Sequence, residues 1–406
     1  MEAEVTRPPS LVRQGDDANR TMPAARCDGE RLRVMHVITH LDMGGAESVA
    51  MDLIDTLRPR VDSALFAVLR QRVPGAVGRD MARRLATWHI PVRFGVAGRF
   101  KSGGALVAAL RLVRALRQLR PDVVHLHAEF AELTFALACV LSAHARRVAL
   151  VRTVHNCELW IAWHGLGRWV TGRLAHGDAI AVSRAAADAD AAIATKRHRP
   201  RADLVYNGVG RPPRAIASAG SGPFRLLFAG RLVHQKGADL LPAILEAAWR
   251  RTSRRDVMVT IAGTGVLRDA VARGIAGALR GWTVRMVPPI ERLSERLGDF
   301  DGLLVPSRFE GFGLLPVEAL MAGIPVVTTN APGLDETIPG DYPLKAAVGD
   351  VDALAERVAS MISAGQAYRL IAARYGERLA LRFDPAAMAD AYADRYAALA
   401  RRGARA

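Results

Sequence analysis

Along most of the chain, short continuous runs of apolar residues alternate with longer stretches in which apolar residues recur every three or four positions. The short runs are typical of buried parallel strands, and the longer stretches of helices that cover a sheet. In the first half the pattern predicts strands at residues 31–39, 63–69, 122–127, 147–155 and 179–183, and helices at 46–57, 76–87, 104–119, 130–143 and 160–175.

The alternation restarts after residues 211–223, a segment rich in Pro, Gly, Ser and Ala. Beyond it the pattern predicts strands at residues 224–230, 257–263, 283–288, 301–307 and 325–329, and helices at 237–251, 266–278, 291–297, 315–322 and from 351 onward. Two such sets indicate two doubly wound α/β domains, whose ligands bind beyond the carboxyl ends of the strands. Two facing domains therefore predict a cleft lined by loops.

Domain boundaries follow from where the alternation begins, stops and restarts. Residues 1–30 are polar, without periodicity, and are predicted to be a disordered lead-in. A first Rossmann-like domain is expected at 31–210, a linker at 211–223, a second Rossmann-like domain at 224–382, and a final helix and tail at 383–406.

Composition narrows the classes of partner and compartment. The 406 residues carry a formal net charge of +16, which favours nucleotide phosphates or acidic lipid surfaces. The basic residues are not interleaved with aromatic ones, so nucleic acid is not expected. Cys27, Cys139 and Cys157 fit no disulfide or metal framework, which favours a reducing compartment. With no secretory signal and no long apolar run, the chain is expected to be cytoplasmic, at most peripheral to a membrane.

The stretch "PSRFEGFGLLPVEALMAGIPVV" at residues 306–327 places Glu310 and Glu318 on either side of a glycine-rich turn. Pro316 suits the first turn of a helix, so Glu310 is predicted on a loop and Glu318 about one turn into that helix. Backbone N–H groups at the helix start attract an anion. Two solvated glutamates are the alternative, but the loop chemistry favours a diphosphate with one carboxylate on each side.

Three further loops have similar chemistry. "FAGRLVHQKG" puts Arg231 and Lys236 beside a helix start, and two fixed cations five residues apart suit a diphosphate. "DMGGAES" and "IAGTGVL" have glycines that permit close backbone approach, although plain turns would also explain them. No G-x-G-x-x-G fingerprint is present, which argues against a dinucleotide.

Two histidines, His125 and His127, share one face of the strand at residues 122–127. His127 is nearer the carboxyl end and so nearer the predicted cleft. For His125 the simple interpretation is a buried, hydrogen-bonded residue. A metal pair would require a third ligand, and the spacing indicates none.

Taken in order and spacing, these motifs resemble the retaining glycosyltransferases of the GT-B fold, family 4 (glycosyl transferases group 1). The resemblance spans about residues 31–400, and E-x7-E is the signature of that family. It rests on "GGAE", "DVVHLH", "TVHN", "AVS", "VYNGV", "GRLVHQKG", "GTG" and the stretch at 306–327.

The resemblance implies roles for the matching residues. Arg231 and Lys236 would bind the donor diphosphate, and Glu318 would hold the ribose hydroxyls. Glu310 and His127 would lie by the transferred sugar. The rest of the implied donor site is Gly44, Gly45, Gly263, Gly265, Gly311, Phe312, Gly313 and Leu314. The first domain would bind the acceptor and the second the nucleotide sugar, and a C-terminal helix within 383–400 would cross back to the first domain.

The expected reaction is sugar transfer from a nucleotide diphosphate to a glycan, a lipid-linked sugar or a small molecule, in cell-envelope or exopolysaccharide synthesis. Arg231, Lys236 and the helix start would stabilise the leaving phosphate, so no metal or other cofactor is expected. Two alternatives stay open. A sugar-nucleotide epimerase would turn over the donor alone, and a non-catalytic scaffold would have lost the chemistry that Arg231, Lys236, Glu310 and Glu318 retain.

A basic amphipathic helix is predicted at residues 104–119, where Arg111, Arg114 and Arg117 recur at three-residue spacing. Such a helix can lie on anionic lipid, although a solvated face is the more ordinary explanation. Residues 159–173 add three tryptophans among basic residues as a second interfacial candidate.

Overall fold

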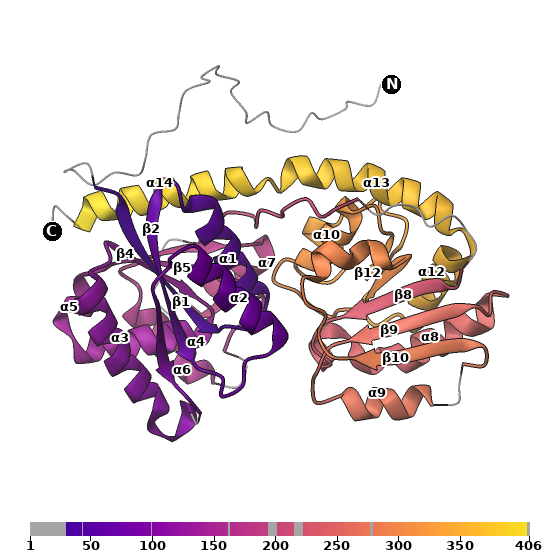
Figure 1. Cartoon of the computed structure of the whole chain (residues 1–406), viewed down its shortest axis with the longest axis horizontal. Coiled ribbons are helices and arrows are strands. Elements are labelled where there is room, and N and C mark those ends of the chain that lie inside the picture. Colours follow the sequence, from indigo (N-terminus) through magenta and orange to yellow (C-terminus); the bar gives the residue numbers. More distant parts are fainter. Residues whose placement is uncertain are drawn as a thin grey trace, which may run out of the picture.

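The computed structural model describes residues 30–42, 44–98, 100–160, 163–193, 201–214, 222–276 and 279–403. Within these ranges two α/β domains lie side by side, and two long helices, α13 and α14, run along both of them (Figure 1). The predicted lead-in, apart from residue 30, and the middle of the predicted linker lie outside the described residues, as does Cys27.

The first domain is built on seven parallel strands in the order β3-β2-β1-β4-β5-β6-β7. They are β1 (Leu32–His40), β2 (Val61–Leu69), β3 (Val92–Val96), β4 (Val123–His127), β5 (Ala149–Val154), β6 (Asp178–Ala181) and β7 (Asp203–Leu204). The apolar pattern did not predict β3, because only its last two residues are buried. The two-residue edge strand β7 was not predicted either, and the other strands follow the predicted runs.

Helices cover both faces of this sheet (Figure 1). Along β1, Leu32 and Val34 belong to the core shared with α14, whereas Met35 and Val37 belong to the core under α3 and α4. The helices are α1 (Gly45–Leu57), α2 (Ala76–Thr87), α3 (Ala105–Leu119), α4 (Glu129–Leu141), α5 (Ala143–Arg147), α6 (His164–Arg173) and α7 (Arg184–Ile193). A π-helical turn at Phe100–Gly104 precedes α3.

The second domain has six parallel strands in the order β10-β9-β8-β11-β12-β13. They are β8 (Phe224–Ala229), β9 (Val257–Ala262), β10 (Trp282–Val287), β11 (Gly302–Val305), β12 (Val326–Thr329) and β13 (Lys345–Ala346). Its helices are α8 (Leu241–Arg251), α9 (Arg268–Ile275), α10 (Leu314–Met321), α11 (Leu334–Thr337) and α12 (Val351–Ser363). Two predicted helices differ from the structure. The helix predicted from residue 237 begins only at Leu241, where Pro242 occupies the first turn of α8. The helix predicted at 291–297 is a 3₁₀ helix at Leu293–Asp299.

The crossing C-terminal helix is confirmed. Helix α13 (Gly365–Arg382) covers the second domain, and α14 (Pro385–Gly403) lies on the first domain (Figure 1). The helical conformation is interrupted between them, just before Pro385. Tyr396 Oη is 2.7 Å from His125 Nδ1 in β4, and Tyr392 Oη is 2.8 Å from Thr153 Oγ1 in β5. The last helix is thus joined to the centre of the first sheet.

The domains also meet directly. A Cβ atom on Gly311 would lie only 1.7 Å from the carbonyl oxygen of His155, so only glycine permits this approach. Glu336 of α11 accepts hydrogen bonds from the N–H groups of Arg184 (2.9 Å) and Ala185 (3.2 Å) at the start of α7. A carboxylate of the second domain therefore binds the positive end of a helix in the first.

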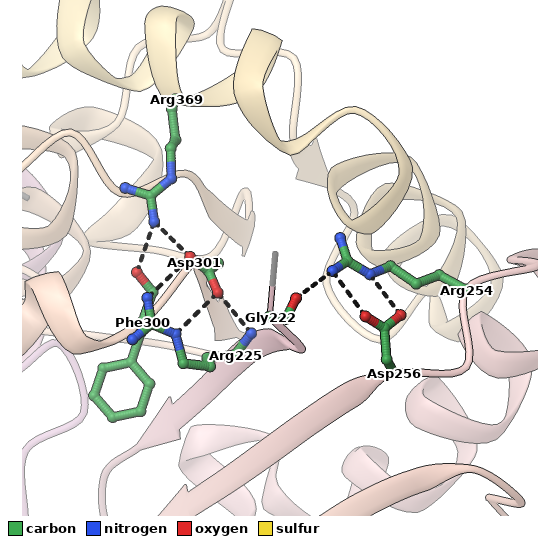
Figure 2. Close-up of polar contacts among 7 residues, drawn as sticks. All are labelled: Gly222, Arg225, Arg254, Asp256, Phe300, Asp301 and Arg369. Atoms are coloured by element: carbon green, nitrogen blue, oxygen red, sulfur yellow. Dashed lines mark hydrogen bonds and ion pairs between the residues drawn. The ribbon is translucent and has the colours of Figure 1, made fainter. Parts of the chain in front are cut away.

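Figure 2 shows how Asp301, just before β11, links β8 to α13. Its carboxylate accepts hydrogen bonds from the Arg225 backbone N–H (2.8 Å), from Arg225 Nε (3.1 Å) and from Arg369 Nη2 (2.7 Å). Burial acts to raise the pKa of Asp301, but the hydrogen bonds from both arginines hold it below its usual value. The ionised carboxylate therefore stabilises the fold above its usual pKa, and this contribution is lost as the pH falls.

We expect Asp301→Asn to lower the free energy of unfolding at pH 7 by about 2–3 kcal/mol, because it leaves Arg225 and Arg369 without their charge partner. Urea unfolding would measure this, and the difference from wild type should shrink as the pH falls below 4. Asp256→Asn is the matched control, since its exposed pair with Arg254 lies in the same view (Figure 2). Equal effects of the two substitutions would contradict this account.

Candidate active site

A cleft of about 1070 Å³ lies between the domains and is lined by loops at the carboxyl ends of strands from both sheets. The first domain contributes the loops after β1, β4 and β5, and the second domain those after β8 and β11 with the start of α10. The predicted residues that line it are Gly44, Gly45, Arg231, Lys236, Glu310, Gly311, Phe312, Gly313, Leu314 and Glu318.

Lys236 and Glu310 form the central ion pair of the second domain. Lys236 Nζ donates to both carboxylate oxygens of Glu310 at 2.6 Å, and Ser307 Oγ donates to Oε1 at 2.8 Å. The Glu310 side chain is nearly buried, so this carboxylate is held in one orientation. The sequence placed both residues on loops of the predicted donor site but did not predict that they pair.

Arg231 is placed differently. Its Nη2 donates to Gln235 Oε1 at 2.8 Å, and no carboxylate lies within ion-pair distance among the residues that the structure describes. Burial raises the pKa of Glu47 and of Glu129 across the cleft, and Arg231 contributes to offsetting this rise in both, after His40 in the case of Glu47. A guanidinium facing the cleft without a carboxylate partner is available for an anion.

The start of α10 combines a glycine turn with a buried aromatic residue. Gly313 has a φ of +82°, a left-handed conformation that favours glycine, and Leu314 begins the helix. The Phe312 ring packs on Phe383 with the ring centroids 4.9 Å apart, so Phe312 anchors the turn while its neighbours face the cleft. Four residues into α10, burial and the nearby Asp52 raise the pKa of Glu318 to about 7.

The two glycines after β1 differ. A Cβ on Gly44 would lie 2.1 Å from Glu47 Oε2, whereas a Cβ on Gly45 would meet nothing within 4 Å. The Glu47 carboxylate thus covers Gly44, but it is the movable end of a flexible side chain, so the contact alone does not require glycine. The Glu47 carboxylate is also 3.5 Å from His40 Nδ1. Both glycines line the cleft, as the sequence predicted, and their contact with a donor stays a prediction.

Two predicted site residues are not brought to the cleft. Gly263 and Gly265 are absent from its lining, and Cβ atoms there would lie 1.9 Å from the Gly230 carbonyl oxygen and 2.3 Å from that of Leu232. These glycines allow the loop after β9 to pack against the loop after β8. This packing explains why glycine stands at both positions, and the donor contact expected at "GTG" stays a prediction.

His127 is also withdrawn from the cleft. Its side chain is 1% exposed, and its ring nitrogens lie 3.2 Å from His36 Nδ1 and 3.0 Å from His155 Nε2. His155, from the "TVHN" motif, lines the cleft in its place. The signal for His155 was its position just beyond the carboxyl end of β5, the strand next to β4 in the sheet.

His36, His125 and His127 could supply three ring nitrogens within 4.8 Å of one another, as a metal site requires. His125 does not suit that role, because its Nδ1 is 2.7 Å from Tyr396 Oη and its Nε2 is 2.6 Å from Thr153 Oγ1. Both of its nitrogens therefore already have hydroxyl partners. His36 is the third histidine that the spacing did not indicate, since it comes from a different strand.

Comparison with known proteins extends over most of the chain. Residues 223–364 match the family Glycosyl transferases group 1, and residues 43–211 match Glycosyltransferase Family 4. A glycogen synthase of Mycobacterium tuberculosis is 30% identical over 349 residues, which cover 81% of this chain and 78% of that protein. A 2-deoxystreptamine glucosyltransferase of Streptomyces kanamyceticus is 28% identical over 338 residues, covering 75% and 79% of the two chains.

Among solved structures, Anabaena HepE in complex with UDP and glucose has a TM-score of 0.72 at 19% identity, over 90% of this chain and 99% of that one. This likeness shows the shared fold of two Rossmann-like domains. Together with the relatives and the cleft, it places the chain in the family of glycosyl transferases group 1, with the GT-B fold.

Proposed function

We propose that this glycosyltransferase moves a sugar, with retention of configuration, from a nucleotide-diphosphate donor to a glycan, lipid-linked or small-molecule acceptor. We further propose that it needs no metal ion or other cofactor and acts in envelope or exopolysaccharide synthesis. The observation that carries the proposal is the convergence of Arg231, Lys236 and the start of α10 on one cleft. A UDP-sugar is the first donor to test, because HepE was solved with UDP and glucose.

The charges in the cleft suit a departing diphosphate. Among the described residues, Arg231 has no carboxylate partner, and Lys236 forms an ion pair with Glu310. A diphosphate would therefore meet one available guanidinium, one ammonium and the N–H groups at the start of α10. These groups stabilise negative charge that develops as the glycosidic bond breaks.

Glu310 suits a positioning role better than that of a nucleophile. Its two oxygens accept three hydrogen bonds from Lys236 and Ser307, so most of its lone pairs are engaged. In the proposed reaction the acceptor hydroxyl attacks from the face that the phosphate leaves, and the phosphate takes its proton. Glu310 would then align the transferred sugar between the acceptor hydroxyl and the leaving phosphate.

The first domain offers a surface for an anionic membrane, which would bring the enzyme to a lipid-linked acceptor. On α3 the apolar side chains Leu106, Val107 and Leu110 are about half exposed, and Arg111, Arg114 and Arg117 are exposed beside them. Such a helix can insert apolar groups while its arginines meet lipid phosphates.

The tryptophan segment contributes less than expected. Trp163 and Trp169 are partly exposed, but Trp160 is buried in the core under α4. None of the helices in the described ranges is long and apolar enough to cross a bilayer.

We expect Lys236→Ala to lower turnover about 10²–10³-fold, because it removes a cation from the leaving diphosphate. A thermal-shift screen of UDP-, GDP- and ADP-sugars would select the donor, and sugar transfer would then be measured by product analysis. Arg273→Ala, an exposed cation on α9, is the control. Wild-type turnover in the Lys236 variant, or epimerisation of the donor without acceptor, would contradict the proposal.

Glu318→Gln tests the carboxylate proposed to bind ribose. Since its pKa is raised to about 7, the ionised form costs stability, and the cost grows as the pH rises from about 4.5 to 7. We therefore expect the variant to gain on the order of 2 kcal/mol of unfolding free energy at pH 8 and none at pH 4, while binding the donor more weakly. The exposed Glu356→Gln is the control. Equal stability at pH 8 would exclude this account of Glu318.

Flotation with vesicles of anionic lipid at low salt tests the membrane contact. Three arginines near the surface contribute about 1 kcal/mol each, so the triple variant of Arg111, Arg114 and Arg117 to Gln should bind about a hundredfold more weakly. The triple variant of Arg268, Arg273 and Arg280 to Gln has the same net charge and should bind like wild type. Equal losses of vesicle binding in both triple variants would show a general effect of net charge and contradict a contact through α3. Absence of vesicle binding by the wild-type protein would also contradict the contact.

A further inference from the structure

Three histidines from neighbouring strands form a hydrogen-bonded chain that leads from the core to the cleft. His36 Nδ1 of β1 is 3.2 Å from His127 Nε2 of β4, and His127 Nδ1 is 3.0 Å from His155 Nε2, just after β5. These strands are adjacent in the sheet, and His36 and His127 are fully buried. Only His155 among the three lines the cleft.

The protons on this chain can be counted. Burial lowers the pKa of His36 and of His155 to about 3 and that of His127 well below its usual value, so all three rings are neutral near pH 7. Three neutral rings carry three N–H protons, and each of the two N···N contacts requires one. The third proton must lie at one end of the chain, on His36 Nε2 or on His155 Nδ1.

The buried end decides between these two arrangements. His36 Nε2 is buried and has no hydrogen-bond partner among the described residues. An unpaired buried N–H is rarer in proteins, and costs more, than an unpaired acceptor. The third proton therefore belongs on His155 Nδ1, at the end where water or substrate can accept its hydrogen bond.

We infer that His127 is a positioning residue, which donates from Nδ1 and thereby holds His155 as a neutral Nδ1–H donor at the cleft. His36 completes the hydrogen-bonded chain by donating from Nδ1 to His127 Nε2. His125 takes no part, because its ring nitrogens bond to Tyr396 and Thr153.

The consequence for catalysis rests on the proposed function. A neutral imidazole fixed in one tautomer can donate a hydrogen bond to a hydroxyl of the transferred sugar or of the acceptor without reorganising during the reaction. His127 would then affect turnover through His155 rather than by touching the sugar.

The tautomers can be read from ¹⁵N-histidine NMR of the ligand-free protein, with signals assigned by single substitutions. We expect His36, His127 and His155 all to carry the proton on Nδ1, whereas free imidazole rings in water favour Nε2. Exposed His144 is the internal control. Protonation of His155 on Nε2 in the wild type would overturn the inference, whatever the enzyme proves to transfer.

Two substitutions of His127 test the roles of its two ring nitrogens separately. The amide of Asn places a donor near the position of Nδ1, whereas that of Gln reaches the position of Nε2. We expect His127→Leu to lower kcat about tenfold, because it removes one hydrogen bond, and to change the KM for the donor little. We expect His127→Asn to restore most of the lost kcat. Higher activity in His127→Gln than in His127→Asn would instead show direct action through Nε2. If no donor is turned over, the proposed function fails while the NMR result stands.

Discussion

Buried polar groups must find partners, and in this chain the partners of the first sheet come from the far end of the sequence. Tyr392 and Tyr396 of α14 bring two hydroxyls into the core, where they meet Thr153 and His125 at 2.8 and 2.7 Å. An unpaired hydroxyl or ring nitrogen there would cost about 1–3 kcal/mol. The pairing therefore joins the C-terminal helix to β4 and β5, the strands that lead into the cleft.

This connection helps to define the distance between the domains. Helix α13 is held to the second sheet through Arg369 and Asp301, and α14 to the first through its tyrosines. Between them the cleft is narrow enough for Gly311 to touch the His155 carbonyl, and Glu336 reaches the start of α7. Loops from two independently built sheets thus face one volume, which is what a donor and an acceptor require.

Electrostatics in the cleft follow from the same enclosure. Burial raises the pKa of Glu318 to about 7 and that of Asp52 to about 6, and it keeps the histidine chain neutral. Lys236 and Glu310 satisfy each other, while Arg231 has no carboxylate partner among the described residues. On the loops after β8 and β11 the site therefore combines Arg231 with one ion pair and the N–H groups at the start of α10, which suits a substrate group that carries negative charge.

The sequence alone was sufficient for most strands of both sheets, the crossing helix and the second-domain loops, because continuous apolar runs and glycine or proline turns act locally. It missed β3, whose half-exposed residues have no apolar run, the two-residue edge strands β7 and β13, and the late start of α8. It also determined the enzyme family, since Arg231, Lys236, Glu310 and Glu318 lie within short motifs.

What only the tertiary structure decided were contacts between distant segments. The pairing of Lys236 with Glu310 spans 74 positions, and the contact of His36 with His127 spans 91. The same holds for the replacement of His127 by His155 at the cleft, and for the packing that explains Gly263 and Gly265. Local patterns report which side chains a strand buries, but which polar atoms meet is set by how neighbouring strands and the two domains pack together.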